Sequence, residues 1–283
     1  MFDRIGFDVV GNIAILKFDR GASVAAKKKF ALDYLDKHKA VTTVVEKIGK
    51  FSGRLRTLKT KWLAGVKTRE ALYRENGCEF RFNIDTSYFS PRLSEERKNI
   101  ASFVKKGERV LVMFGGVAPF AIVIGKKLKS FKLSAHPPTL KFANNYRRGI
   151  DEVISVELGK EPSRYAVENI KRNKLIGVVS AVQGDVRRII GHGKKVSGVF
   201  DRIVMARPNL EDSFLDVAFR VAKRGTIIHY YGFYPESEVE LLRELIALEA
   251  LRAGKRVKIL RIVKAGDIGT RKFRFRADLK ILN

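Results

Sequence analysis

The pattern of apolar and polar positions predicts two regions of different architecture. From about residue 91 onward, short apolar runs typical of buried strands are separated by segments with the 3.6-residue periodicity of helices. This alternation is typical of a doubly wound, mostly parallel sheet, which residues 257–263 and 272–279 would close as a late antiparallel pair. The other expected strands are 109–114, 153–157, 178–183, 200–205 and 225–231, and the expected helices are 95–105, 118–126, 163–173, 212–224 and 236–253.

The first 85 residues predict a smaller mixed domain. Residues 7–18 have the pattern of two short strands joined by a turn, and residues 25–38 have helical periodicity. We therefore expect a small α+β domain over residues 1–85 and a large α/β domain over residues 86–283. Further strand-like pieces of the small domain lie at 42–45, 53–59 and 79–84.

One stretch of the large domain does not follow the alternating pattern. Residues 130–150 are longer than a typical connection between a helix and a strand, and they carry Arg147 and Arg148. The stretch is either a functional loop or a locally folded insertion.

The net charge of the chain indicates what kind of partner it binds. The chain has 57 Lys+Arg against 30 Asp+Glu, a formal net charge of +27. Such an excess creates a field that attracts polyanions, so RNA or DNA is the expected partner. The alternative is a basic surface that only keeps the protein solvated.

Cysteine usage and hydropathy indicate the compartment. Cys78 is the single cysteine, which rules out a disulfide within the chain, and the first ten residues lack the layout of a signal peptide. The longest apolar run, 110–125, is interrupted by glycines and a proline and is too short to span a bilayer. We expect a cytoplasmic protein that does not enter the membrane.

The strongest local motif is the segment VLVMFGGVAPF at residues 110–120. A buried strand there enters a turn with Gly115 and Gly116 and then a helix. Ligands of open α/β sheets bind at the carboxyl ends of strands, where small residues let backbone N–H groups approach the ligand. Because Ala118 occupies the last small position, the segment does not fit GxGxxG, and a tight strand–helix connection is the alternative.

Two acidic residues strengthen the interpretation of this turn as a ligand-binding site. Glu157 ends the next expected strand and is placed to accept both hydroxyls of a ribose. Asp185 follows a further strand and is placed to meet an adenine amino group. Either acid alone is more often a helix cap or a surface charge. The ordered set of Gly116, Glu157 and Asp185 favours an adenosyl ligand.

A second group of chemical side chains lies at the hinge between the two expected domains, YFSPRLSEER at residues 88–97. An aromatic residue that can stack on a base, two arginines and a carboxylate for proton removal occur within ten residues. The alternative is structural: Ser94 would open a helix as part of a capping box, with Pro91 as an ordinary stop. The histidines and the cysteine lack zinc-site spacing, so we predict no metal.

With these motifs established, the chain resembles the archaeal and eukaryotic class I tRNA guanine-N1 methyltransferases that act at position 37. The likeness covers nearly the whole chain, and YFSPRLxxER together with HYYGF is specific. The matching stretches are YRENGCEF (73–80), YFSPRLSEER (88–97), VLVMFGGVAPF (110–120), VISVELGKEPSRYAVENIKRNK (153–174), FDRIVMARP (200–208) and GTIIHYYGF (225–233).

The resemblance implies a Rossmann-like class I domain that uses S-adenosyl-L-methionine (AdoMet), with a base-contacting N-terminal domain. Glu96 would be the general base at N1, and Arg56 would stabilise charge on O6 of the target base. This agrees with the chemistry, because guanine N1 carries a proton at neutral pH. The implied cofactor contacts are Arg97, Met113, Phe114, Gly116, Glu157, Leu158, Asp185, Val186 and Ala206, and the implied substrate contacts are Tyr88, Arg92, Arg207 and Pro208.

Departures from the family pattern point to a particular branch. Val112 and Ala118 replace a common Asp and Gly, and Ala206 replaces the Asn of an Asn-x-Pro motif. The altered pocket resembles the archaeal "a" branch, which is associated with N1 methylation of guanosine and C7 methylation of the wyosine intermediate imG-14. The chain begins where the family's middle domain begins, so the resemblance implies an enzyme without the small domain that reads the tRNA elbow.

The resemblance therefore implies tRNA as the partner, tRNA-Phe in particular, bound through its anticodon stem-loop, and an enzyme that acts as a monomer. Two alternatives stay open at this point. The same fold transfers the aminocarboxypropyl group of AdoMet in other wyosine-pathway enzymes. A non-catalytic RNA-binding module is the second alternative, suggested by Val112 and Ala206.

Overall fold

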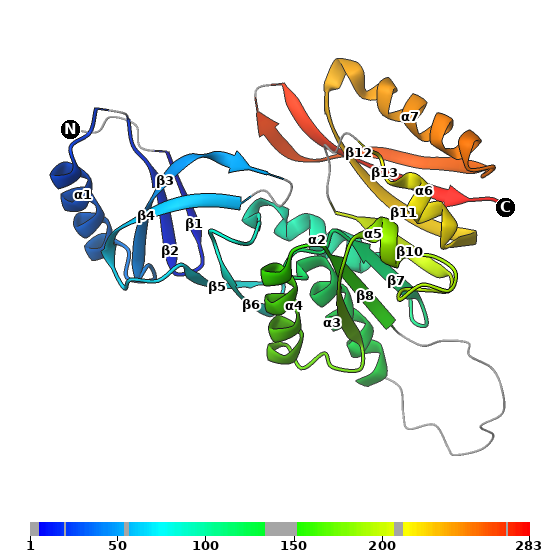
Figure 1. Ribbon diagram of the computed structural model, residues 1–283, viewed down its shortest axis with the longest axis horizontal. Coiled ribbons are helices and arrows are strands. Elements are labelled where there is room, and N and C mark those ends of the chain that lie inside the picture. Colours follow the sequence, from blue (N-terminus) through cyan, green and yellow to red (C-terminus); the bar gives the residue numbers. More distant parts are fainter. Residues whose placement is uncertain (1–5, 20, 54–56, 134–151, 207–211, 270) are drawn as a thin grey trace.

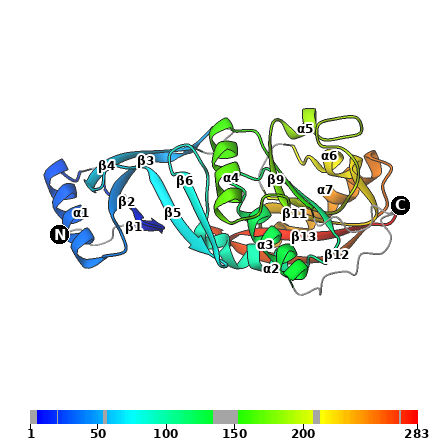
Figure 2. The same cartoon turned by 90° about the horizontal axis from the view of Figure 1, so that it is seen from below.

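The computed structural model contains three β-sheets, two of which form separate layers with helices (Figure 1). Figure 2 shows the sheet of β1 to β4 at one end of the molecule, the large sheet at the other, and the β5–β6 hairpin between them. None of the helices in the described part of the chain has the length and apolar character needed to cross a bilayer. The structure describes residues 6–19, 21–53, 57–133, 152–206, 212–269 and 271–283.

The small sheet has the strand order β1-β2-β3-β4, with helix α1 packed against β3 and β4. β2 and β3 are parallel, so α1 forms the crossover between them. Ser23 caps the start of the helix, because its side chain accepts a hydrogen bond from the Ala26 N–H at 3.2 Å. The elements are β1 (Gly6–Val10), β2 (Ile13–Lys17), α1 (Val24–Lys37), β3 (Thr43–Ser52) and β4 (Thr57–Gly65).

The large sheet has the order β12-β13-β11-β10-β7-β8-β9. β7, β8, β9, β10 and β11 are parallel, and the β12–β13 hairpin joins β11 through the antiparallel strand β13. The chain order reverses at β7, so the carboxyl ends of β7 and β10 flank a topological switch point, where ligands bind in open sheets. The strands are β7 (Arg109–Met113), β8 (Glu152–Glu157), β9 (Val179–Gln183), β10 (Phe200–Met205), β11 (Ala222–Pro235), β12 (Val257–Gly269) and β13 (Lys272–Ile281).

Helices cover both faces of this sheet. Along β7, Val110 and Val112 belong to one apolar cluster with α2, α3 and α4, whereas Leu111 and Met113 belong to another with α6 and α7. This alternation follows from the two-residue period of a strand, and it explains why the strand is apolar throughout. The helices are α2 (Ser94–Ser102), α3 (Pro119–Leu133), α4 (Lys160–Arg172), α5 (Val186–Ile189), α6 (Leu215–Arg220) and α7 (Val239–Arg252), with short 3-10 turns η1 (Pro91–Leu93) and η2 (Glu236–Glu238).

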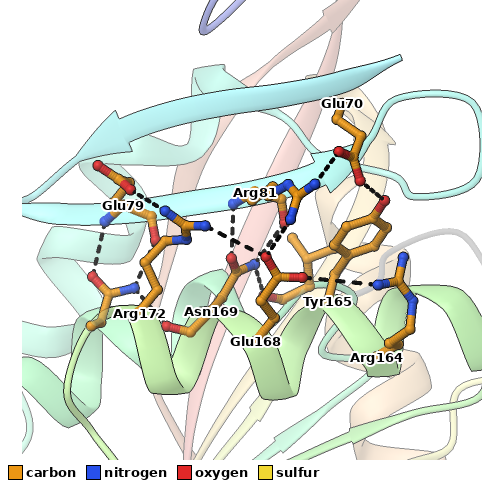
Figure 3. A network of polar contacts seen from close by, with 10 residues as sticks. Glu70, Glu79, Arg81, Arg164, Tyr165, Glu168, Asn169 and Arg172 are labelled. Carbon is orange, nitrogen blue, oxygen red and sulfur yellow. Dashed lines mark hydrogen bonds and ion pairs between the residues drawn. The ribbon is translucent and has the colours of Figure 1, made fainter. Parts of the chain in front are cut away.

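The hairpin of β5 (Glu70–Glu75) and β6 (Cys78–Asn83) is attached to α4 by polar contacts (Figure 3). Asn169 accepts a hydrogen bond from the Arg81 N–H at 2.8 Å and donates to the Arg81 carbonyl at 3.1 Å. One helical turn later, Asn173 makes the same pair of bonds with Glu79, at 2.9 and 2.7 Å. Two amide side chains thus satisfy the backbone of β6 as a neighbouring strand would.

The other side of the hairpin contacts the small sheet. Gly11, in the β1–β2 turn, has φ +59°, and a Cβ there would collide with the Leu72 carbonyl oxygen of β5. Asn12 accepts a hydrogen bond from the Leu72 N–H at 2.7 Å. Contacts with α4 on one side and the β1–β2 turn on the other make the hairpin the joint between the two larger layers. The predicted domain boundary at residue 85 stays a prediction.

The α/β class with a small N-terminal α+β part and the alternating elements after residue 91 are confirmed. Several details were wrong. β5 was not predicted, and α6 is shorter than the expected helix at 212–224. The strand expected at 53–59 is β4 at Thr57–Gly65, and β3, β11 and β12 extend beyond the expected 42–45, 225–231 and 257–263. The capping-box alternative is also wrong, because α2 begins at Ser94 without a side-chain cap. Most of residues 130–150 lie outside the described residues, so the choice between a functional loop and a locally folded insertion stays a prediction.

Candidate active site

The turn after β7 has an unusual backbone. Phe114, Gly116 and Ala118 have φ values of 60°, 56° and 66°, in the left-handed region that glycine tolerates and other residues avoid. Two non-glycine residues with positive φ cost of order 1–3 kcal/mol each, and such strain concentrates at ligand sites. A Cβ on Gly115 would collide with the buried Ser155 hydroxyl of β8, so this position requires glycine.

The carboxylate of Glu157 lies against this turn. Oε2 accepts a hydrogen bond from the Gly116 N–H at 2.9 Å, and Oε1 accepts one from the Gly159 N–H at 2.7 Å. The side chain is therefore fixed at the carboxyl ends of β7 and β8, as the sequence predicted. Each carboxylate oxygen can accept more than one hydrogen bond, so Glu157 retains capacity for ribose hydroxyls. The residues present fit an adenosyl group.

Three further predicted cofactor contacts, Leu158, Asp185 and Val186, are brought to the same edge of the sheet. Asp185 ends the β9 connection as the N-cap of α5, where it accepts a hydrogen bond from the Arg187 N–H at 2.9 Å. Val186 is buried beside it, and Leu158 accepts a hydrogen bond from Gln183 at 3.1 Å through its carbonyl. Asp185 therefore has the capping role named as the alternative, and its contact with adenine stays a prediction.

Met113, Phe114 and Ala206 also lie at this edge. Met113 ends β7 and is buried, and its carbonyl accepts a hydrogen bond from the Ala206 N–H at 3.3 Å, just beyond β10. The Phe114 ring packs edge-on against Phe214, with ring centroids 5.2 Å apart. Arg56, Arg207 and Pro208 were predicted to contact the substrate, and they lie outside the described residues.

The hinge segment runs alongside the glycine turn. A Cβ on Gly116 would lie 3.6 Å from the Tyr88 carbonyl oxygen, so the turn and the segment are neighbours. Arg92 is largely exposed and forms an ion pair with Asp8 of β1 at 3.0 Å. Tyr88 thus lies beside the glycine turn, and Arg92 contacts the small sheet.

Arg97 has a structural contact that the sequence did not reveal. Its guanidinium forms a bidentate ion pair with Glu75 of β5, and both side chains are almost fully buried. It also donates to the Ser90 carbonyl at 3.1 Å and lies over the Phe89 ring, 4.9 Å from its centroid. Arg97 thus ties the hinge to the β5–β6 hairpin, and a contact with the cofactor stays a prediction.

Glu96 is the buried carboxylate of α2. Its Oε1 accepts two hydrogen bonds, from the Tyr231 hydroxyl at 2.6 Å and from Arg276 Nη1 at 2.6 Å. Burial, as the largest cause, raises the pKa of Tyr231 well above its usual value. The phenol therefore keeps its proton and donates it to Glu96 in this hydrogen bond. Glu96 also lines a groove of about 480 Å³ between α2 and the end of β12. The groove is lined by Arg92, Glu95, Glu96, Lys98, Asn99, Ser102, Lys264, Ala265 and Gly266.

Sequence reasoning missed the residues that surround Glu96. Tyr231 lies in the HYYGF segment, whose role the sequence left open, and Arg276 lies in the expected last strand. The run KFRFRAD at 272–278 alternates phenylalanine with arginine and ends in an acid, which is unusual for a strand within a largely buried sheet. That pattern was the signal for a polar interior on this side of the sheet.

The strand order and the acid at the glycine turn define a Rossmann-like domain of the class found in AdoMet-dependent methyltransferases. Residues 71–147 and 141–260 match the family model of the TRM5/TYW2 methyltransferase domain. The chain belongs to the TRM5/TYW2 methyltransferase family, which confirms the resemblance seen in the sequence.

Two relatives share about the same identity with this chain. It is 30% identical over 282 residues to the tRNA (guanine(37)-N(1))-methyltransferase Trm5b of Pyrococcus abyssi, covering 97% of this chain and 74% of the relative. It is 30% identical to the tRNA (guanine(37)-N(1))/4-demethylwyosine(37)-methyltransferase Taw22 of Nanoarchaeum equitans, covering 98% and 100%.

Solved structures show the same fold. The crystal structure of Trm5b from Pyrococcus abyssi superposes with a TM-score of 0.79 at 29% identity, over 98% of this chain and 75% of that one. The structure of TYW2 from Methanocaldococcus jannaschii superposes with a TM-score of 0.69 at 22% identity, over 98% and 100%. The second likeness shows the fold alone.

Proposed function

We propose that this protein is an AdoMet-dependent tRNA methyltransferase that modifies the purine at position 37, beside the anticodon. The substrate atom is N1 of guanosine, C7 of the wyosine intermediate imG-14, or both. The observation that carries the proposal is the anchored Glu96 carboxylate beside a groove, in a family whose model is a methyltransferase domain. The names of the two relatives at 30% identity support N1 of guanine 37 as the substrate atom, and the name of the second also supports 4-demethylwyosine at the same position as a substrate.

AdoMet, when bound, supplies an electrophilic methyl group. Glu157 and the Gly116 turn hold the adenosyl end, and Asp185 is the proposed partner of adenine. Glu96 takes the N1 proton of guanosine as the methyl group arrives, so the methylated base stays neutral and the carboxylate becomes a carboxylic acid. Arg56 is the proposed cation at O6. The target base is unstacked from the anticodon loop, where extrusion costs least.

The substrate side is proposed in the same terms. Tyr88 stacks on the extruded base, while Arg92, Arg207 and Pro208 line its path. The net charge of +27 draws tRNA to the protein, so the apparent affinity for the anticodon stem-loop of tRNA-Phe should fall steeply as salt is raised. We further propose that the enzyme acts as a monomer in the cytoplasm, where its single cysteine, the buried Cys78, stays reduced.

A transfer assay tests the proposal directly. The protein is incubated with AdoMet labelled in its methyl group and with two tRNAs, one carrying unmodified guanosine at position 37 and one carrying imG-14. Incorporation of label into either tRNA, with a mass gain of one methyl at position 37, is the expected result. A tRNA with guanosine replaced by adenosine at that position is the control and should stay unlabelled.

A second candidate function has one observation in its favour. The matching family model also covers TYW2. A transfer of the aminocarboxypropyl group would leave the methyl label on the small product and add a much heavier group to imG-14. Mass analysis of the modified nucleoside therefore separates the two reactions. If calorimetry showed no AdoMet binding at all, both transferase functions would be wrong, and a non-catalytic RNA-binding module would be the remaining candidate.

A further inference from the structure

A row of polar side chains is buried beneath Glu96, on one face of β10, β11 and β13. Each of its members is at most 4% exposed. Burying charges costs several kcal/mol per ion unless each is paired and hydrogen-bonded, so such a row needs a reason. The members are Arg202, His229, Tyr231, Arg276 and Asp278.

The pairing of β11 with β13 creates the row. In this antiparallel pair, His229 is the direct partner of Asp278, and Tyr231 is the direct partner of Arg276. Residues two apart on a strand point to the same face, and direct partners across strands lie close together. One register therefore brings four polar side chains to the side of the sheet on which α2 carries Glu96.

The hydrogen bonds of the row have a fixed direction. Arg202 is held by Glu108 and donates from Nη1 to His229 Nε2 at 2.8 Å, while His229 Nδ1 lies 2.5 Å from Asp278 Oδ1. An arginine can only donate and a carboxylate can only accept, so His229 is neutral, with its proton on Nδ1. Burial lowers the pKa of His229, which agrees with this assignment.

Arg276 continues the row to Glu96. Its Nε donates to Asp278 Oδ1 at 2.9 Å, and its Nη1 donates to Glu96 Oε1 at 2.6 Å. Burial opposes ionisation of Asp278, but its hydrogen bond with His229 and the neighbouring arginines outweigh that effect and hold its pKa below the usual value. Arg276 is thus fixed at one end by an ionised carboxylate and presented to Glu96 at the other.

Glu96 is therefore held asymmetrically. Oε1 receives both donors, Tyr231 and Arg276, whereas Oε2 has no hydrogen-bond partner among the residues that the structure describes. Two donors on one oxygen fix the plane of the carboxylate. The Glu96 side chain also lines the groove between α2 and β12.

We propose that Tyr231 and Arg276 are positioning residues that hold the Glu96 carboxylate by Oε1, so that Oε2 faces the target base. Asp278, His229 and Arg202 act one step further away by fixing Arg276. The inference rests on the proposed role of Glu96 as the base. It adds that the last two strands of the sheet, and not only the hinge motif, determine whether that base is aligned.

The test compares two neighbouring tyrosines of β11. Tyr231→Phe removes the hydroxyl that contacts Glu96, and Tyr230→Phe removes a hydroxyl from the other face, where Tyr230 packs with the apolar cluster of α6 and α7. We expect kcat for tRNA methylation to fall about tenfold in Tyr231→Phe, with the KM values for tRNA and AdoMet within about twofold of the wild type, because misalignment slows chemistry and not binding. Tyr230→Phe should keep the kcat of the wild type.

Arg276→Lys gives a second readout. A cation able to donate to Glu96 Oε1 remains in this variant, so its kcat should fall less than that of Tyr231→Phe, again with KM values close to those of the wild type.

The outcomes separate this inference from the proposed function. If Glu96→Gln turns over like the wild type, the proposed base is wrong. If Glu96→Gln is inactive but Tyr231→Phe keeps the kcat of the wild type, the base stands and the positioning role is overturned. A rise in KM without a change in kcat would also overturn it. Thermal unfolding of each variant confirms that it is folded, and Tyr231→Phe decides the question if Arg276→Lys does not fold.

Discussion

Replacing Asn169 by alanine should destabilise the protein strongly, because this side chain links three parts of the fold. It is fully buried on α4. It accepts from the Arg81 N–H at 2.8 Å and donates to the Arg81 carbonyl at 3.1 Å and to the Val117 carbonyl at 3.3 Å. The first two bonds hold the β5–β6 hairpin, and the third holds the glycine turn after β7.

The magnitude follows from these three bonds. A buried hydrogen bond contributes about 1 kcal/mol, and more when a partner is left without water, so Asn169→Ala should lower the free energy of unfolding by about 3 kcal/mol. The matched control is Asn173→Ala, one turn along α4. Asn173 also makes three hydrogen bonds, two with Glu79 and one with the Asn169 carbonyl, but it is only half-buried. Water can replace its bonds, and we expect a loss of about 1 kcal/mol.

Urea unfolding followed by circular dichroism measures both values. The reasoning requires Asn169→Ala to lose at least twice as much stability as Asn173→Ala. Equal losses, or a loss below about 1 kcal/mol for Asn169→Ala, would refute the claim that burial of the amide decides the cost. AdoMet affinity of the folded Asn169→Ala variant should also fall, since the Val117 carbonyl adjoins Gly116, whereas Asn173→Ala should bind AdoMet like the wild type.

Three further predictions follow from buried or anchored charges. Arg97→Met should cost about 3–5 kcal/mol in urea unfolding, because it leaves Glu75 buried without its partner, and adding Glu75→Gln should recover part of the loss; no recovery would contradict the pairing. Because the pKa of His229 is lowered in the folded protein, the unfolded chain binds a proton below about pH 6.5 that the folded chain does not bind. The free energy of unfolding should therefore decrease as the pH falls from about 7 to about 5. His229→Gln keeps one donor for Asp278 and one acceptor, and its unfolding temperature should change less over this range; an equal decline would exclude His229 as the cause. Glu157→Gln should weaken AdoMet binding by roughly tenfold in calorimetry, and unchanged affinity would remove Glu157 from the cofactor site.

The sequence was informative about the centre of the large sheet, because β7 and β8 are apolar runs buried on both faces. The helices α3, α4 and α7 are long enough for their periodicity to be seen. β5 was not predicted, since only Ala71 and Glu75 of its six residues are buried and it lacks an apolar run. The hairpin depends on Asn169 of α4 and on Asn173 at its C-cap, which lie 88 and 94 residues away in the chain from the residues they bind. Local periodicity carries no information about such partners.

The candidate site was also predicted only in part from the sequence. Gly116, Glu157 and Glu96 were identified from motifs, because each lies next to a strand or helix boundary that the pattern reveals. Tyr231 and Arg276 were not, because their role depends on the register between β11 and β13, which sets which side chains share a face. Arg97 matched the family motif, yet a distant residue of β5 determines its contact in this fold.

The measurement that tests the central claim most directly compares Glu96→Gln with Glu95→Gln in a single-turnover methyl-transfer assay. The two residues are neighbours on α2, but Glu95 is exposed, whereas Glu96 is buried and anchored by Tyr231 and Arg276. We predict that Glu96→Gln abolishes transfer to position 37 while AdoMet binding and folding persist, and that Glu95→Gln transfers at the rate of the wild type. Undiminished transfer by Glu96→Gln would contradict the account.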